Sequence, residues 1–91
     1  MQRFQKIHCG RSVDEQRAIH AKMLVFGKLS LAERKRITGL IREIAGDERE
    51  VESLLRVLTK GVTPETESAL NGVPAGTLYR LQREFYRRCP L

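Results

Sequence analysis

Arginines gather near the C-terminal end of the chain at spacings that suit one side of a helix. At about 3.6 residues per turn, Gly76, Arg80, Arg83 and Arg87 fall within a single strip. A guanidinium group can donate paired hydrogen bonds to guanine O6 and N7, and it also binds phosphate oxygens. These residue types therefore favour contacts with nucleic acid, provided that a helix presents the strip to solvent. The alternative is an ordinary solvated helix face.

Neighbouring polar residues add further hydrogen-bond donors along the same helix. The candidate DNA-contacting residues are Gly76, Thr77, Tyr79, Arg80, Arg83, Arg87 and Arg88. Arg80 is the expected base contact, whereas the three later arginines are expected to meet phosphates, which adds affinity but little sequence information. The small residues at the helix start permit close approach of the DNA backbone, and the Tyr79 hydroxyl can donate to a phosphate.

The positive charge is concentrated at the two ends of the chain. The formal net charge is +6, of which residues 1–11 carry +3 from Arg3, Lys6 and Arg11. Residues 79–91 carry another +3, from four arginines against one glutamate, and the charges between these segments cancel. This distribution favours a polyanionic partner, although terminal charge can also serve solubility alone.

Serine followed three residues later by glutamate marks the start of a first helix. Ser12 with Glu15 forms a capping-box pattern, which predicts a helix over Val13 to Phe26. The apolar residues of one face follow at helical spacing: Ile19, Met23 and Phe26. Gly27 is placed to end this helix in a left-handed conformation.

The same pattern occurs twice more. The caps and stops are Ser30 with Glu33 before Gly46, and Asp47 with Glu50 before Gly61. The apolar stripes between them are Ile37, Leu40, Ile41 and Ile44 in the second helix, and Val51, Leu54, Leu55 and Leu58 in the third. No stretch alternates apolar and polar residues as a half-buried strand would. We therefore predict an all-α fold, a small bundle of about five helices.

The last third of the chain contains two further predicted helices joined by a short turn. Thr63 is a good N-cap for a short helix, Pro64 to Leu70, and Asn71-Gly72 supplies residues that tolerate positive φ. Val73 follows as an apolar plug. A longer helix, about Ala75 to Arg88, is expected to bury Leu78, Leu81 and Phe85.

The string Gly72-Val-Pro-Ala-Gly-Thr-Leu-Tyr-Arg resembles the turn and recognition helix of tetracycline-repressor-type, LuxR-type and resolvase-type regulators. In those regulators Gly-Val-Ser-x-x-Thr-Leu-Tyr-Arg is common. The segment from Leu54 to Gly61 resembles the first helix of the same trihelical unit. The resemblance implies a C-terminal helix-turn-helix in which Thr77, Tyr79 and Arg80 touch bases or phosphates, and Leu78 and Leu81 pack in the core.

The chain departs from that pattern at two places. Glu67-Ser68 stands where an apolar residue followed by Ala is usual, and Pro74 replaces the usual capping Ser or Thr. The resemblance does not extend to the first 50 residues. It therefore supports a class of DNA-binding unit rather than one particular family.

These patterns predict one helical domain over residues 1–91. Residues 1–11 would form a flexible basic N-terminal arm, residues 12–46 a helical part that is a candidate dimerisation surface, and residues 47–91 the helix-turn-helix. The predicted function is a sequence-specific DNA-binding transcriptional regulator with double-stranded DNA as its partner, acting as a homodimer or with a partner regulatory protein. The alternative is a small protein-binding module, such as a phage or plasmid accessory factor.

Other function classes find little support in the sequence. The candidate metal or redox residues, His8, Cys9, His20 and Cys89, lack the close paired spacing of zinc sites and of a disulfide framework. No nucleophile with a base or pair of carboxylates indicates an enzyme, so no cofactor or metal is expected. The longest apolar run, Met23 to Phe26, is far short of a membrane span, and a cytosolic location is predicted.

Overall fold

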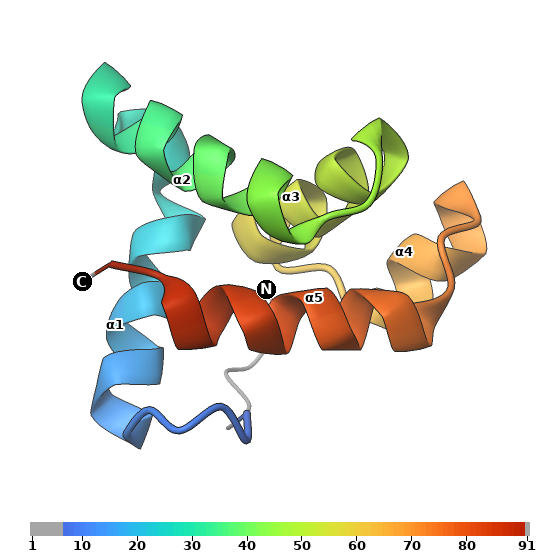
Figure 1. Cartoon of the computed structure of the whole chain (residues 1–91), viewed down its shortest axis with the longest axis horizontal. Coiled ribbons are helices and arrows are strands. Elements are labelled where there is room, and N and C mark those ends of the chain that lie inside the picture. Colours follow the sequence, from blue (N-terminus) through green and yellow to red (C-terminus); the bar gives the residue numbers. More distant parts are fainter. Residues whose placement is uncertain (1–6, 91) are drawn as a thin grey trace.

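The computed structural model describes residues 7–90, and within them the chain forms five α-helices and one short 3₁₀-helix (Figure 1). The helices are α1 (Val13–Leu24), the 3₁₀-helix (Phe26–Lys28), α2 (Leu31–Ile44), α3 (Glu48–Lys60), α4 (Pro64–Asn71) and α5 (Ala75–Arg88). No strand occurs among the described residues. The prediction of a small all-α bundle is confirmed, and the predicted bounds of the last helix agree with those of α5.

Side-chain caps begin four of the helices. The capping residues are Ser12, Ser30, Asp47 and Thr63, each accepting the main-chain N–H three residues farther along. At Ser12 the capping box is complete, because the Glu15 carboxylate also accepts the Ser12 N–H at 3.0 Å. At Ser30 it is not, because the Glu33 carboxylate instead forms an ion pair with Lys22 of α1 at 2.9 Å. That ion pair ties the second helix to the first.

Two of the predicted helix stops are wrong in their mechanism. The first helix ends at Leu24 rather than Phe26, and the chain continues through the 3₁₀-helix, where Gly27 does not have positive φ. The 3₁₀ geometry begins when Val25 N–H bonds to Lys22 O, which tightens the last turn. The second helix ends at Ile44 with extended Ala45 as its C-cap, and Gly46, the predicted stop, follows without positive φ.

The main core is built from the inner faces of α1, α2, α3 and α5. Its fully buried members at the centre are Ile19, Met23, Ile41, Leu54, Leu81 and Phe85. All of them belong to the predicted apolar stripes, which confirms the periodicity. A second, smaller cluster of Val57, Val73 and Leu78 lies between α3, the α4–α5 turn and α5. Helix α4 contributes no hydrophobic residue to either cluster.

The N-terminal segment differs from the predicted free arm, as far as the structure describes it. Ile7 and the Gln16 side chain exchange two hydrogen bonds of 2.7 Å, and Gln16 is completely buried. Arg11 donates to the Cys89 carbonyl at 2.5 Å, so this segment is also tied to the end of α5. Residues 7–11 are therefore packed against the domain because buried Gln16 uses their main chain as its partner. Residues 1–6 lie outside the described part.

Candidate functional site

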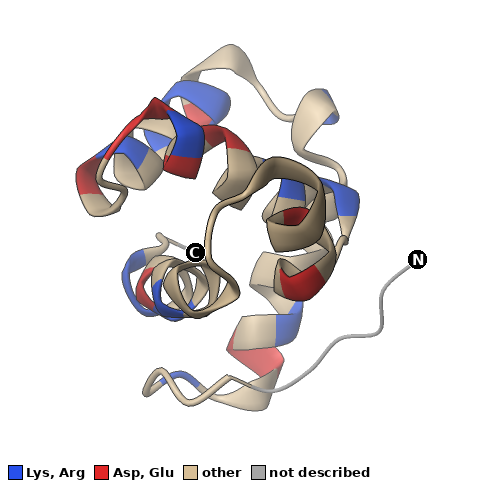
Figure 2. Cartoon of the chain, turned by 90° about the vertical axis from the view of Figure 1, so that its right-hand side faces the viewer, with Lys and Arg blue, Asp and Glu red and all other residues tan. Residues whose placement is uncertain are grey.

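Helix α5 divides into a buried face and a basic exposed face. Leu78, Leu81 and Phe85 are completely buried. The predicted contact residues on the other side are Gly76, Tyr79, Arg80, Arg83, Arg87 and Arg88, all exposed, with Thr77 half-buried. At about 100° per residue, the strip of Gly76 and the arginines at 80, 83 and 87 spans roughly 60° of the helix surface. In Figure 2, where α5 is seen nearly end-on, basic residues lie on the side turned away from the other helices.

The four arginines differ in whether their guanidinium groups are already engaged. Arg87 bonds to Glu84 one turn back, and Arg88 pairs with Glu43 of α2 at 3.5 Å. Arg80 and Arg83 form no hydrogen bond or ion pair with any other residue in the range 7–90. These two groups are therefore available to an external ligand.

Glu84 is the one acidic residue on this helix. The hydrogen bond from Arg87 is the largest cause that lowers the pKa of Glu84, and the charges of Arg88 and Arg80 lower it further. The carboxylate is thus ionised at neutral pH, and it offsets part of the positive charge. Arg83 is not among the arginines whose charges lower the pKa of Glu84.

Tyr79 is held by the neighbouring helix. Its ring is 42% exposed, and its hydroxyl donates to the Glu65 carboxylate of α4 at 2.6 Å. This hydrogen bond raises the pKa of Tyr79, and burial adds to the effect. The expected phosphate contact from this hydroxyl would require the bond to break, and the Glu65 charge would repel a phosphate nearby. The sequence pattern gave no sign of this pairing, because the two residues lie 14 positions apart.

We expected positive φ at the Asn71-Gly72 turn before α5, and one of the two residues has it. Gly72 has φ of 80°, and its N–H bonds to Ser68 O at 2.8 Å. Asn71 is instead the last helical residue of α4. Val73 is buried against Val57, as the predicted plug should be. Pro74 then begins α5 without any side-chain cap, unlike the other four α-helices.

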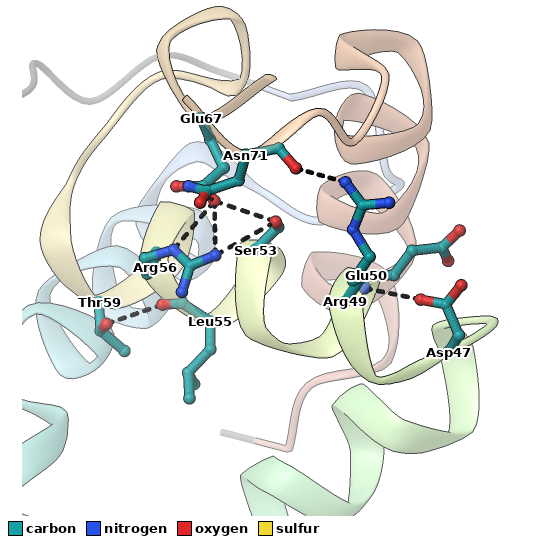
Figure 3. A network of polar contacts seen from close by, with 9 residues as sticks. All are labelled: Asp47, Arg49, Glu50, Ser53, Leu55, Arg56, Thr59, Glu67 and Asn71. Carbon is teal, nitrogen blue, oxygen red and sulfur yellow. Dashed lines mark hydrogen bonds and ion pairs between the residues drawn. The ribbon is translucent and has the colours of Figure 1, made fainter. Parts of the chain in front are cut away.

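A buried glutamate joins α4 to α3, and sequence reasoning did not find it (Figure 3). Glu67 is 2% exposed, and its Oε2 accepts hydrogen bonds from three side chains. The donors are Ser53 Oγ at 3.0 Å, Arg56 Nε at 2.9 Å and Asn71 Nδ2 at 2.6 Å, and Arg56 Nη2 lies 2.8 Å away. This is the position where the resembled regulators carry an apolar residue. Here a satisfied ion pair takes the place of apolar packing.

The charge state of Glu67 follows from two opposing effects. Burial alone would raise the pKa of its carboxyl group, but hydrogen bonds from Arg56, Ser53 and Asn71 and the Arg56 charge outweigh burial and lower it. The hydrogen bond with Glu67 in turn raises the pKa of Arg56. Both groups are therefore charged at neutral pH, and the pair is an ionic link between the two helices.

The cysteines come together in the core although they lie at opposite ends of the sequence. Cys9 and Cys89 are both buried and free, and both belong to the main core cluster. Burial, with smaller effects from these two thiols, raises the pKa of the adjacent Tyr86 to about 12. No group of three or more metal-ligating side chains is found within the described range.

Comparison with known proteins adds no family assignment. The chain has no significant match among protein-family models, curated proteins or solved structures. Among the described residues, no helix has the length and apolar character needed to cross a lipid bilayer.

Proposed function

We propose that the chain is a sequence-specific DNA-binding transcriptional regulator, with α3, α4 and α5 acting as a helix-turn-helix and α5 as the recognition helix. The observation that carries the proposal is the pair of exposed, unengaged guanidinium groups of Arg80 and Arg83 on α5. The left-handed Gly72 turn and the buried opposite face of α5 support it, because together they fix the helix while leaving the basic strip outside.

The dimensions of α5 suit a DNA major groove. A helix with its side chains is about 10–12 Å across, and at a rise of about 1.5 Å per residue the strip from Arg80 to Arg87 extends roughly 10 Å along it. The groove is about 12 Å wide and admits one α-helix. With the start of α5 in the groove, Arg80 in its second turn can reach a guanine edge, while Arg83 and Arg87 approach the phosphates along one wall.

A second copy of the chain would supply the rest of the binding energy. One recognition helix reads few base pairs, and such units commonly bind paired half-sites as dimers. Val25 and Leu31, at the junction of α1 and α2, are 46% and 60% exposed and are the candidate contacts. The proposed location of such a regulator is the cytoplasm.

One observation favours a different function, that of a small protein-binding module. Helix α4 carries Glu65 and no basic residue, and its Leu70 is 74% exposed. In a helix-turn-helix the corresponding helix crosses the DNA backbone, where an exposed carboxylate is unfavourable. An acidic helix with an exposed apolar side chain suits a basic protein surface better.

Binding selection on random DNA with wild-type protein and three variants tests the proposal. Arg80→Ala should relax preference at one base position by about 1–3 kcal/mol. Arg83→Ala should weaken binding to all sequences alike and reduce the slope of log affinity against log salt by about 1. Lys60→Ala, which removes an exposed charge at the far end of α3, is the control and should change little. Equal, weak binding of all sequences by the wild type would contradict the proposal and favour the protein-binding module.

A further inference from the structure

Asn71 is exposed, yet both of its polar ends are held by groups anchored on α3 (Figure 3). Its side-chain Nδ2 donates to Glu67 at 2.6 Å, and its main-chain carbonyl accepts from Arg49 Nη2 at 2.7 Å. Glu67 is itself fixed to Ser53 and Arg56 of α3. The last residue of α4 is thus clamped from two directions.

The clamp lies immediately before the turn that aims α5. A Cβ built on Gly72 would lie 2.8 Å from Arg49 Nη2, so the Arg49 side chain also lies directly against the turn. Beyond the turn, Val73 enters the small cluster, and α5 starts at Pro74 without a side-chain cap. The direction of the first turn of α5 therefore depends on how firmly Asn71 is held, because the local cap that positions other helices is absent.

We propose that Asn71, held between Glu67 and Arg49, is the positioning residue of the DNA-reading face. This inference rests on the proposed function. The clamp fixes the Gly72 turn on α3, and the turn fixes the start of α5, from which Arg80 reaches out. Asn71 need not touch DNA. Its effect on binding is transmitted through the orientation of the helix.

A positioning role makes a distinctive prediction about specific and nonspecific binding. Misplacing Arg80 by about an ångström impairs a paired hydrogen bond to a base, whereas attraction between the arginine strip and phosphates tolerates such a shift. Loss of the clamp should therefore weaken binding to the preferred sequence while binding to random DNA stays unchanged. A residue that only stabilises the fold would leave both affinities unchanged while the protein stays folded, and would lower both alike if the folded fraction fell.

Five variants separate these roles. Asn71→Ala removes the bond to Glu67, and Arg49→Ala removes the bond to the Asn71 carbonyl. Leu70→Ala truncates the neighbouring exposed side chain of α4, and Lys60→Ala removes one positive charge from α3, so they are matched controls. Arg49→Lys keeps a donor and a charge and should recover part of the lost affinity.

Amide hydrogen exchange reads the clamp without DNA. Gly72 N–H bonds to Ser68 O, and Leu78 N–H bonds to Pro74 O at 3.1 Å, so these two amides report on the turn and on the first turn of α5. Asn71→Ala and Arg49→Ala should each lower protection there by about tenfold, as expected for one charge-assisted hydrogen bond. Protection in α1 should fall by no more than the same factor, and every variant should stay folded in the absence of urea.

The two readouts together decide the outcome. About tenfold weaker binding to the preferred DNA in both clamp variants, with unchanged binding to random DNA, supports the inference. Unchanged protection of the two amides overturns it, as does altered protection with unchanged preference for the selected DNA. If the wild type shows no preference for any DNA, the proposed function fails, and the exchange data alone then decide whether Asn71 holds α5 in place.

Discussion

Replacing Glu67 with alanine should destabilise the protein far more than the same truncation at Glu65, the other acidic residue of α4. The carboxylate is 2% exposed and accepts hydrogen bonds from Ser53, Arg56 and Asn71. The variant leaves three donors without their acceptor, and one of these donors carries a charge. Their lost interactions, rather than the lost volume, dominate the expected effect.

The magnitude follows from how much of the pair is exposed to water. Removing one partner of a buried ion pair costs about 3–5 kcal/mol, because the other charge is left uncompensated. The Arg56 side chain is 40% exposed and can regain water, so the lower end of that range applies. We expect a loss of about 3 kcal/mol in the free energy of unfolding, a large part of the total of about 5–10 kcal/mol for a domain of this size.

Urea denaturation followed by circular dichroism at pH 7 measures this loss. Glu65→Ala, two positions earlier on α4, is the control and should cost about 1 kcal/mol or less, because water can replace its hydrogen bond with exposed Tyr79. Arg56→Leu combined with Glu67→Leu removes both charges and should recover part of the loss, but not all of it, because Ser53 and Asn71 still lack their acceptor. A Glu67→Ala protein within about 0.5 kcal/mol of wild type would refute the reasoning.

The same residue gives a pH dependence with a definite sign. Since the pKa of Glu67 is lower in the folded protein than its ordinary value of 4.5, ionised Glu67 stabilises the fold fully above that value. The contribution is lost as pH falls below 4.5 and through the folded pKa. The stability difference between wild type and Glu67→Gln should therefore be constant near neutral pH and shrink in acid. A difference that grows on acidification would contradict this.

Two further predictions concern the turn and the thiols. Gly72→Ala should lower the free energy of unfolding by about 1–2 kcal/mol, measured by urea denaturation, because alanine at a φ of 80° is strained, while the Arg49 side chain can move away from the new methyl group. Cys9 and Cys89 should react with a thiol reagent at pH 8 only at the rate of unfolding or local opening. Both thiols are buried, and burial raises the pKa of Cys89. Rapid labelling of the folded protein would show that the N-terminal segment does not cover them.

The helices and their buried faces could be predicted from sequence because their signals are local. Caps three residues from an acidic partner located α1, α2 and α3, Thr63 with Pro64 located α4, and apolar residues at helical spacing located α5. The sequence of α5 specifies both its bounds and its completely buried residues, such as Leu81 and Phe85. These signals need no knowledge of which helix packs on which.

The failures arose where the outcome depends on contacts between distant segments. Gly27 and Gly46 resemble left-handed stops, but one lies in a 3₁₀-helix and the other follows an extended alanine. Whether a glycine adopts positive φ depends on where the chain must go next, which is a tertiary property. Residues 7–11 were assigned to a free arm because the groups that hold them, buried Gln16 of the next helix and the Cys89 carbonyl after α5, lie outside the segment.

The burial of Glu67 also depended on another helix, but the sequence carried a weak signal for it. Glu67 and Asn71 have the i,i+4 spacing of a side-chain hydrogen bond, and Ser53 and Arg56 lie one turn apart on the preceding helix. A polar residue at a position where the resembled units are apolar is most economically explained by a partner of opposite charge on the facing helix. The basic residues of α3 are Arg49, Arg56 and Lys60, so this reasoning leaves three candidate partners, of which the structure pairs Arg56 with Glu67.

The two ends of the molecule are therefore held by different forces. The main cluster fixes α1, α2, α3 and α5 through apolar packing, which has no group that titrates in acid. Helix α4 supplies no hydrophobic side chain to the clusters and depends on Glu67 and its partners. A hydrogen-bonded carboxylate also has stricter geometry than an apolar contact, so it defines the position of α4 on α3 more closely. Acid should consequently loosen α4 and the Gly72 turn before the main core opens, and α5 would lose its orientation while remaining folded.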